Sequence, residues 1–373
     1  MNVTSADRSA AANNGRPDFD TIVRNFAPSW FAAVMGTGVV AVNSANFGQT
    51  FPVLKSLGEI LHWFNVVLFF VLLVPWLLRW AWYRPQALAA LRDPIMSQFY
   101  ATIAIALLVL GLQFLVYGQS VEVAATFWGI GVVLTILFSF LAPWVLFTSD
   151  QVTLDHVSPG MFIPPVGLVV IPLAGNLLIP HAEGVLKEWL LFLNYTSLGA
   201  GTFLWLGLLA LTVHRFIVGR PLPGAMLPTV WINLGPIGVI VVSLIGLVGA
   251  SPFVSVKEPF QVAALLLWGF GVWWLIMALL LTLAYKRRGE LPFSLTWWAF
   301  TFPLGAFTAA SYRLSTVFHL DSLWGLGLAT YGLLLFLWSA ALINSVMGVV
   351  SGKLFMPPAQ MARSGVSNGP KAG

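Results

Sequence analysis

The sequence predicts an all-α integral membrane protein with ten transmembrane helices. Two observations carry this prediction: the composition and the distribution of uncharged stretches. Of the 373 residues, 58% are hydrophobic and only 8% are charged, and the mean hydropathy is +0.88. Because about a quarter of the residues of a typical soluble domain are charged, this composition excludes a soluble globular protein.

Ten stretches with almost no Asp, Glu, Lys or Arg follow one another along the chain. Each reaches the roughly 20 residues that an α-helix needs to cross about 30 Å of hydrocarbon. The predicted spans cover residues 27–48, 60–80, 97–118, 123–147, 160–180, 188–214, 225–249, 259–285, 292–313 and 323–350.

Polar segments flank these spans at both ends of the chain. The first segment has no apolar core, so it does not form a cleavable signal peptide. The last segment contains Pro, Ser, Gly and Lys, a composition typical of disorder. We therefore predict a cytoplasmic N-terminal tail over residues 1–23, a transmembrane domain over 24–352 and a disordered cytoplasmic C-terminal tail over 353–373.

The distribution of Lys and Arg predicts that both termini are cytoplasmic. With ten spans and a cytoplasmic N-terminus, only Lys55, Lys187, Lys257 and Arg313 of the 18 basic residues fall outside. Cytoplasmic loops are enriched in Lys and Arg, and the predicted loops alternate as this rule requires. We expect a multi-pass protein of the plasma membrane or bacterial inner membrane.

The ionisable residues do not indicate an enzyme. With no cysteine, the chain has no disulfide, Cys-ligated metal site or haem attachment. We find no Ser-His-Asp set, metal-ligand spacing or Schiff-base lysine, so we expect no catalytic residue, metal or cofactor. His62 and His214 lie deepest of the five histidines and are either proton carriers or solvated helix caps. The net charge of +5 comes from basic residues in short loops and does not indicate a nucleic-acid partner.

Backbone-altering residues concentrate in the odd-numbered spans. Proline removes a backbone donor and bends a helix, and glycine removes the side chain. This pattern predicts five helical hairpins around a central pore, each with a kinked inner helix and a smoother outer helix. The alternative is ordinary helix packing, in which small residues are common. The predicted pore-lining or hinge residues are Gly36, Thr37, Gly38, Gly111, Pro165, Gly167, Pro236, Gly238, Pro303 and Gly305.

The ninth span adds a candidate gate. Phe302 shares a helical face with Gly305, Ala306, Ala309 and Arg313. A phenyl ring beside the kink would close a narrow bore by steric blocking and dewetting, or it is an ordinary packing residue. Arg313, about 16 Å along the same face, either attracts anions at the outer mouth or extends to the headgroups. Because no carboxylate lies within a span, the pathway suits anions better than cations.

Three segments resemble the tellurite-resistance/dicarboxylate transporter family. This family includes plant slow-type anion channels, bacterial tellurite-resistance permeases, fungal malate permeases and sulfite efflux pumps. The resemblance covers about residues 24–352 and implies five hairpins around a pore, a homotrimer with a pore in each protomer, and an occluding phenylalanine at Phe302. The segments are Phe26-Ala27-Pro28-Ser29-Trp30-Phe31 followed by Met35-Gly36-Thr37-Gly38, then Asn233-Leu234-Gly235-Pro236, and Trp297-Trp298-Ala299-Phe300-Thr301-Phe302-Pro303.

The expected function is transport of small anions through a phenylalanine-gated pore. The substrate is a C4-dicarboxylate such as malate, or sulfite, or an inorganic anion such as chloride or nitrate. A proton-coupled dicarboxylate carrier and a tellurite or sulfite efflux permease are the alternatives within transport. A carrier would use the protonated substrate itself, His62 or His214. A membrane-embedded enzyme or sensor is the alternative of another class, and it would need a polar cluster that the sequence lacks.

Overall fold

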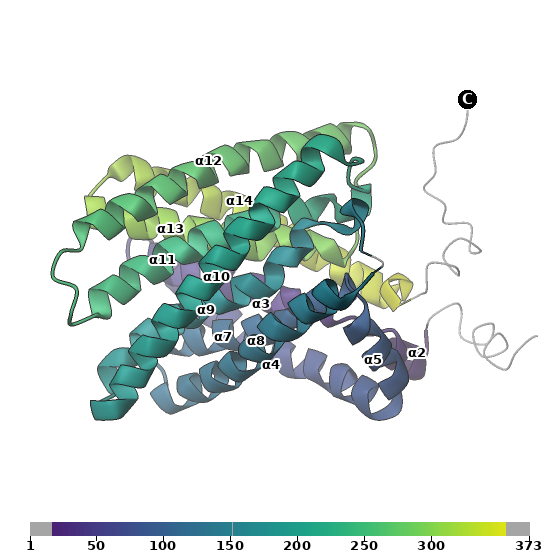
Figure 1. The fold of residues 1–373 in the computed structure, drawn as a ribbon, viewed down its shortest axis with the longest axis horizontal. Coiled ribbons are helices and arrows are strands. Elements are labelled where there is room, and N and C mark those ends of the chain that lie inside the picture. Colours follow the sequence, from purple (N-terminus) through teal and green to yellow (C-terminus); the bar gives the residue numbers. More distant parts are fainter. Residues whose placement is uncertain (1–16, 151, 356–373) are drawn as a thin grey trace, which may run out of the picture.

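A computed structural model describes residues 17–150 and 152–355, and every regular element in those two ranges is a helix (Figure 1). Within the described residues, eight helices are long and apolar enough to cross a membrane, which confirms the predicted class of protein. Eight of the ten predicted spans correspond to these helices. They are Pro52–Trp82, Met96–Val116, Val121–Thr148, Pro159–His181, Gly184–Val218, Gly224–Ala250, Glu258–Arg287 and Asp321–Val350.

The first and ninth predicted spans are also helical, but they are not among these eight. Each consists of a 3₁₀-helix followed by an α-helix of 16 or 18 residues that contains several Ser, Thr or Asn residues. These polar residues lower the hydropathy of both segments. They are η1 (Pro28–Phe31) with α3 (Ala32–Phe47), and η6 (Leu295–Phe300) with α13 (Thr301–Phe318).

Five of the long α-helices form a closed ring, which we call the ring helices. Each contacts the next one in the chain, and the last contacts the first. The three of them that belong to candidate spans are buried over 83%, 89% and 78% of their most apolar stretch. The ring helices are α3, α7 (Ala101–Val116), α9 (Ile163–Leu178), α11 (Leu234–Ala250) and α13.

The other five long helices surround this ring, and we call them the outer helices. Each packs against the ring helix that precedes it, as a helical hairpin does. Their most apolar stretches are only 17% to 33% buried, so most of their surface faces away from the protein. The outer helices are α4 (Pro52–Trp82), α8 (Val121–Thr148), α10 (Gly184–Val218), α12 (Glu258–Arg287) and α14 (Asp321–Val350), and Figure 1 shows how they lie along the molecule.

The sequence Pro-x-Gly occurs at residues 165–167, 236–238 and 303–305, and these motifs mark a change of helix type instead of a kink within an α-helix. Pro165, Pro236 and Pro303 each stand third in their α-helix, directly after a 3₁₀-helix. Proline is tolerated there because the first four N–H groups of an α-helix have no partner within the helix. The predicted mid-helix break is thus replaced by a 3₁₀-to-α transition at the start of α9, α11 and α13. The 3₁₀-helices before α9 and α11 are η3 (Pro159–Phe162) and η5 (Gly224–Asn233).

Short helices lie at the ends of the described chain and in its connections. One of them lies at the end of the predicted N-terminal tail and one at the start of the predicted C-terminal tail. Residues 1–16 and 356–373 of these tails lie outside the described residues, so the predicted domain bounds stay predictions. The short elements are α2 (Phe19–Arg24), α5 (Arg84–Arg92), α6 (Met96–Phe99), η2 (Leu154–His156), η4 (Ile179–His181) and η7 (Lys353–Phe355).

Candidate functional site: a cavity closed by Phe302

A cavity of about 1330 Å³ opens at the N-terminal ends of the ring helices. Each ring helix places residues of its first two turns on the cavity wall. Because the same end of all five helices meets one cavity, the ring helices run in the same direction. These wall residues are Ala32, Met35, Thr102, Ile105, Ile163, Val166, Gly235, Phe302 and Pro303.

The remainder of the wall comes from the 3₁₀-helices, from α6 with the residue before it, from the connection before η6 and from the end of α14. It is mainly apolar, and its hydroxyl groups are largely occupied by the backbone. Thr102 Oγ1 donates a hydrogen bond to the carbonyl of Pro28 at 2.8 Å. Thr229 Oγ1 donates to the carbonyl of Met226 at 2.6 Å. Among the described residues that line the cavity, Lys353 alone carries a charge.

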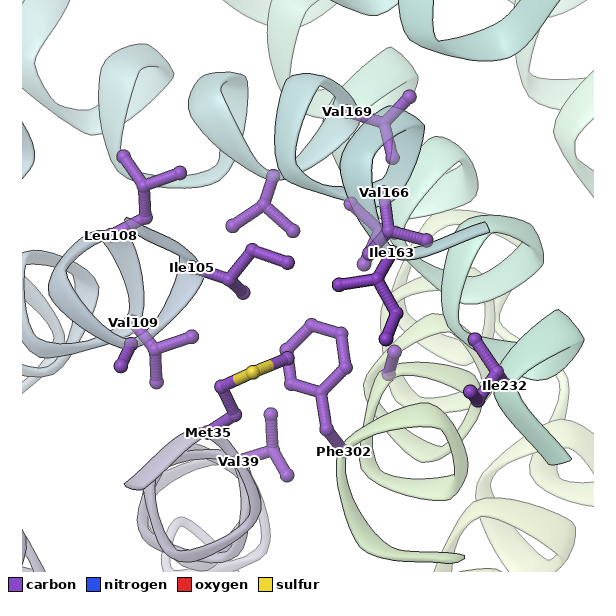
Figure 2. Packing of buried hydrophobic residues seen from close by; sticks show 14 of the residues in the cluster. Met35, Val39, Ile105, Leu108, Val109, Ile163, Val166, Val169, Ile232 and Phe302 are labelled. Carbon is purple, nitrogen blue, oxygen red and sulfur yellow. The ribbon is translucent and has the colours of Figure 1, made fainter. Parts of the chain in front are cut away.

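The phenyl ring of Phe302 lies between ring helices at the end of this cavity. Figure 2 shows the ring facing Met35, Ile105, Ile163 and Val166, which come from α3, α7 and α9. The side chain of Phe302 is only 5% exposed, although it forms part of the cavity wall. Apolar side chains from several helices therefore close around this one ring.

The cavity ends at the level of Phe302. Val39 and Ala306, about one turn further along α3 and α13, are buried and do not line the cavity. The residue before the motif proline is Phe302 in α13 but Gly235 in α11. A Cβ on Gly235 would lie 3.8 Å from Phe302 Cε1, so the missing side chain leaves room for the ring. The bulky residue of one motif thus lies beside the smallest residue of another.

Sequence comparison identifies the protein family of this chain. The model of the voltage-dependent anion channel family, SLAC1, matches residues 25–346. The chain belongs to this family. The match covers all ten predicted spans apart from the last few residues of α14, in agreement with the resemblance described above.

Relatives of this SLAC1-family protein carry transport names. An uncharacterized transporter of Methanocaldococcus jannaschii is 48% identical over 90% of this chain and 96% of its own length. A sulfite efflux pump of Arthroderma benhamiae is 27% identical over 80% of this chain and 84% of its own. A malic acid transport protein of Schizosaccharomyces pombe is 26% identical over 75% of this chain and 68% of its own. These names describe transport and not catalysis.

In this SLAC1-family protein, the predicted pore-lining glycines pack between helices. A Cβ on Gly36 would overlap Thr301 Oγ1, and a Cβ on Gly305 would lie 2.5 Å from Val39 Cγ2. These two glycines therefore allow α3 and α13 to approach closely. A Cβ on Gly238 would overlap the backbone of Ala306 on α13. These glycines thus lie at the contacts of the ring helices, and their role as pore-lining or hinge residues stays a prediction.

The remaining predicted glycines have the same role at other contacts. A Cβ on Gly38 would overlap Val109 Cγ1 on α7. Gly111 and Gly167 both face α8, where added Cβ atoms would lie 2.9 Å from the Ala124 carbonyl oxygen and 3.0 Å from Thr135 Cγ2. A helical wheel shows which residues share a face, but not which helix that face meets, so it does not reveal these contacts.

The other predicted residues divide between the cavity and the helix contacts. Thr37 Oγ1 accepts a hydrogen bond from Trp338 Nε1 on α14 at 3.1 Å, so it does not face the cavity. Pro165 and Pro236 are buried away from the cavity wall, whereas Pro303 lies on it. Of the proposed pore residues, the structure therefore places Phe302 and Pro303 on the wall.

Arg313 and the two histidines lie away from the cavity. Arg313 is exposed near the C-terminal end of α13, the end opposite the cavity. His214 is exposed on α10, as expected of a solvated residue. His62 is fully buried, and its Nε2 lies 3.1 Å from Gln119 Oε1, so the solvated alternative is wrong for His62. No group of three or more acidic or histidine residues in the described part of the chain could hold a metal ion.

The sequence prediction does not include most of the apolar residues of the wall. Met35, Ile105 and Val166 lie one turn after another wall residue of the same helix, at i and i+3. This spacing at the start of three ring helices is a signal that could have indicated them. Lys353 had no such signal, because it lies outside the predicted spans.

Proposed function

We propose that the ring of α3, α7, α9, α11 and α13 forms the pathway for a small anion and that Phe302 is its gate. The observation that carries this proposal is the position of the Phe302 ring at the closed end of a large cavity between the ring helices. An apolar ring in a narrow bore blocks an anion in two ways, by occupying space and by excluding the water that would hydrate the ion. Anion transport itself follows from the family.

The electrostatics of the cavity favour a negative ion. The five ring helices direct their N-terminal ends toward the cavity, and each such end carries about half a positive charge. Arg79 is buried behind the wall, where its Nη1 donates to the carbonyl of Phe26 at 2.6 Å. No described wall residue is a carboxylate that would cancel this potential. Helix ends and a buried cation thus replace the ring of basic side chains that is common in anion pores.

We further propose that all ten predicted spans cross the membrane and that both termini are cytoplasmic. The hairpin packing of each ring helix with its outer helix supports ten spans. The bias of Lys and Arg supports the orientation, which places the cavity on the cytoplasmic side. The family resemblance supports a homotrimer in the plasma membrane or bacterial inner membrane, with one pathway in each protomer.

Sulfite and malate are the substrates that we would test first. Relatives named for sulfite efflux and malic acid transport align over 80% and 75% of this chain. Chloride, nitrate and tellurite remain the inorganic candidates. A proton-coupled carrier is the second possibility, but neither His62 nor His214 lies on the cavity wall, so the protonated substrate would have to carry the proton.

The Phe302→Ala variant tests the gate. We expect its anion flux in liposomes to exceed that of the wild type at least tenfold, which corresponds to about 1.4 kcal/mol of lost barrier. Flux is measured separately with sulfite, malate, chloride and nitrate, with and without a pH gradient, per amount of folded protein. An increase only under a pH gradient would support the coupled carrier.

Phe307→Ala is the matched control on the same helix. Phe307 is fully buried, stacks on Trp268 with ring centroids 5.7 Å apart, and does not line the cavity. We expect it to lower stability without raising flux. Equal flux of Phe302→Ala and wild-type protein, at equal amounts of folded protein, would refute Phe302 as the gate.

A further inference from the structure

Lys353 is the one charged residue among the described residues of the cavity wall. It follows α14 and begins η7, and its side chain is exposed. The wall residues nearest to it in the chain, Ser351 and Leu354, are uncharged. Lys353 therefore provides the full charge nearest to an ion that enters the cavity, within the part of the wall that the structure describes.

The two ends of the described chain hold this lysine in place. Asn25 Nδ2 donates a hydrogen bond to the carbonyl of Phe355 at 2.9 Å. The ring of Phe355 is 5% exposed and stacks on Trp30, with centroids 5.6 Å apart. Residues 25 and 30 are more than 300 positions away in the sequence, so only the fold brings them to this turn. We call these contacts of Asn25 and Trp30 with Phe355 the terminal clasp.

The backbone on either side of Lys353 is also constrained. Gly352 has φ +73°, a conformation that favours glycine, and a Cβ there would overlap Pro17. A Cβ on Gly348 would lie 2.6 Å from Leu354 Cδ1, so the turn folds back closely onto α14. Lys353 thus projects from a turn whose backbone is constrained on both sides, so its charge stays within reach of the cavity.

No acidic partner neutralises Lys353 within the described residues. The salt bridges found there are Arg24 with Asp20 at 2.9 Å and Arg288 with Glu290 at 3.3 Å. Neither pair includes a wall residue. An unpaired charge at an opening attracts counter-ions over about one Debye length, near 8 Å at physiological salt.

We infer that Lys353, held by the terminal clasp, recruits the transported anion at the open end of the cavity. This inference rests on the proposed anion pathway and adds a specific residue to it. The described wall is otherwise uncharged, so loss of this charge lowers the local anion concentration at the entrance. Recruitment affects how often an ion enters, and not how Phe302 closes the pathway.

The test compares charge variants in a Phe302→Ala background, where entry and not the gate limits the flux. At low ionic strength, we expect Lys353→Gln to lower sulfite or malate flux about two- to fivefold, the effect of one charge over several ångströms of water. This difference should vanish near 1 M salt, where the Debye length falls to about 3 Å. Lys353→Arg keeps the charge and should retain the flux of the parent variant.

Lys286→Gln is the matched control. Lys286 is an exposed lysine in the last turn of α12 and does not line the cavity, so its loss removes the same charge elsewhere. We expect the parent flux. Unchanged flux in Lys353→Gln, an equal loss in Lys286→Gln, or a loss that persists at high salt would each overturn the inference. Absence of flux in the Phe302→Ala parent would instead refute the gated pathway itself, and the role of Lys353 with it.

Discussion

The ring of helices has two unlike halves that meet at Phe302. The cavity half, which holds the first turns of the ring helices, surrounds its space with side chains such as Met35, Ile105 and Val166. The cross-linked half, beyond Phe302, joins its helices by polar contacts. Asn43 Nδ2 donates to the carbonyl of Gly305 at 2.9 Å, a bond between α3 and α13.

Further polar contacts connect the other helices of the cross-linked half. Asn176 Nδ2 on α9 donates to the carbonyl of Ser243 on α11 at 3.0 Å, and Ser243 Oγ donates back to the carbonyl of Val169 at 2.9 Å. Thr308 Oγ1 on α13 donates to Thr330 Oγ1 on α14 at 3.0 Å. A buried polar group that loses its partner is costly, so these contacts fix the helices relative to one another.

The difference between the halves explains where a moving part can exist. Apolar contacts are not directional, so the Phe302 ring can change its rotamer without leaving a polar group unsatisfied. The cavity next to it provides the space for that change. The cross-linked half has no such freedom. The proposed gate therefore lies at the boundary between the cross-linked half and the cavity.

The largest effect that we expect comes from glycine substitutions on α11, where the two halves meet. A Cβ on Gly238 would overlap the backbone of Ala306, which cannot move without separating α11 from α13. We expect Gly238→Ala to lower the free energy of unfolding by about 3 kcal/mol or more, the upper range for overpacking. Thermal unfolding followed by tryptophan fluorescence in detergent measures this loss.

Gly235→Ala is the control on the same helix, three residues earlier. Its Cβ would lie 3.7 Å from Pro303 Cβ and 3.8 Å from Phe302 Cε1, which is ordinary van der Waals contact. We expect a melting temperature close to that of the wild type. Equal melting temperatures for both variants would contradict the view that close backbone packing beyond Phe302 forms the frame.

The same glycines show what the sequence could and could not predict. The uncharged stretches located the helical segments, whereas the arrangement of ten membrane spans as hairpins around a pore stays a prediction. The packing role of Gly36 and Gly238 was not accessible, because it depends on the neighbour that each glycine meets. The contact between Asn25 and Phe355 depends on folding across the whole chain. Sequence periodicity shows which residues share one face of a helix. The packing of the two glycines and the contact between Asn25 and Phe355 depend on tertiary contacts, which periodicity does not show.

His62 shows the same limit of prediction from sequence. Its position near a predicted span end indicated either a proton carrier or a solvated residue. In the structure, Phe114 packs edge-on against its ring with centroids 4.8 Å apart, and Gln119 contacts its Nε2. Both partners lie more than 50 residues away in the sequence. The hydrophobic pattern placed the helix correctly but did not reveal which helix covers it.

A smaller effect should follow from removing one polar cross-link. Asn43→Leu removes the bonds that Asn43 Nδ2 donates to the carbonyls of Val39 and Gly305. We expect a loss of about 1–2 kcal/mol in the free energy of unfolding, the usual range for one or two hydrogen bonds. Met35→Leu in the cavity half keeps an apolar side chain of similar volume and should cost less than about 1.5 kcal/mol.

These two variants also differ in the expected flux. Met35 faces the Phe302 ring (Figure 2), so its replacement changes the surface against which the ring closes. We expect Met35→Leu to alter anion flux with little change in the unfolding transition, and Asn43→Leu to do the opposite. If Asn43→Leu changed flux more than stability, the separation between frame and gate would be wrong.

The smallest effect that we expect concerns the terminal clasp. Phe355→Ala removes the stacking on Trp30 and leaves the charge of Lys353 in the protein. Because a buried phenylalanine contributes about 3–5 kcal/mol to local packing, η7 should detach from the cavity while the ring helices keep their unfolding transition. In the Phe302→Ala background, we expect about a twofold loss of flux at low salt, since a mobile charge attracts ions less effectively than a fixed one.

Flux equal to the parent at low salt would mean that the charge acts without the clasp. A lower melting temperature would mean that the clasp belongs to the rigid frame, and the boundary between the two halves would then have to include the ends of the chain.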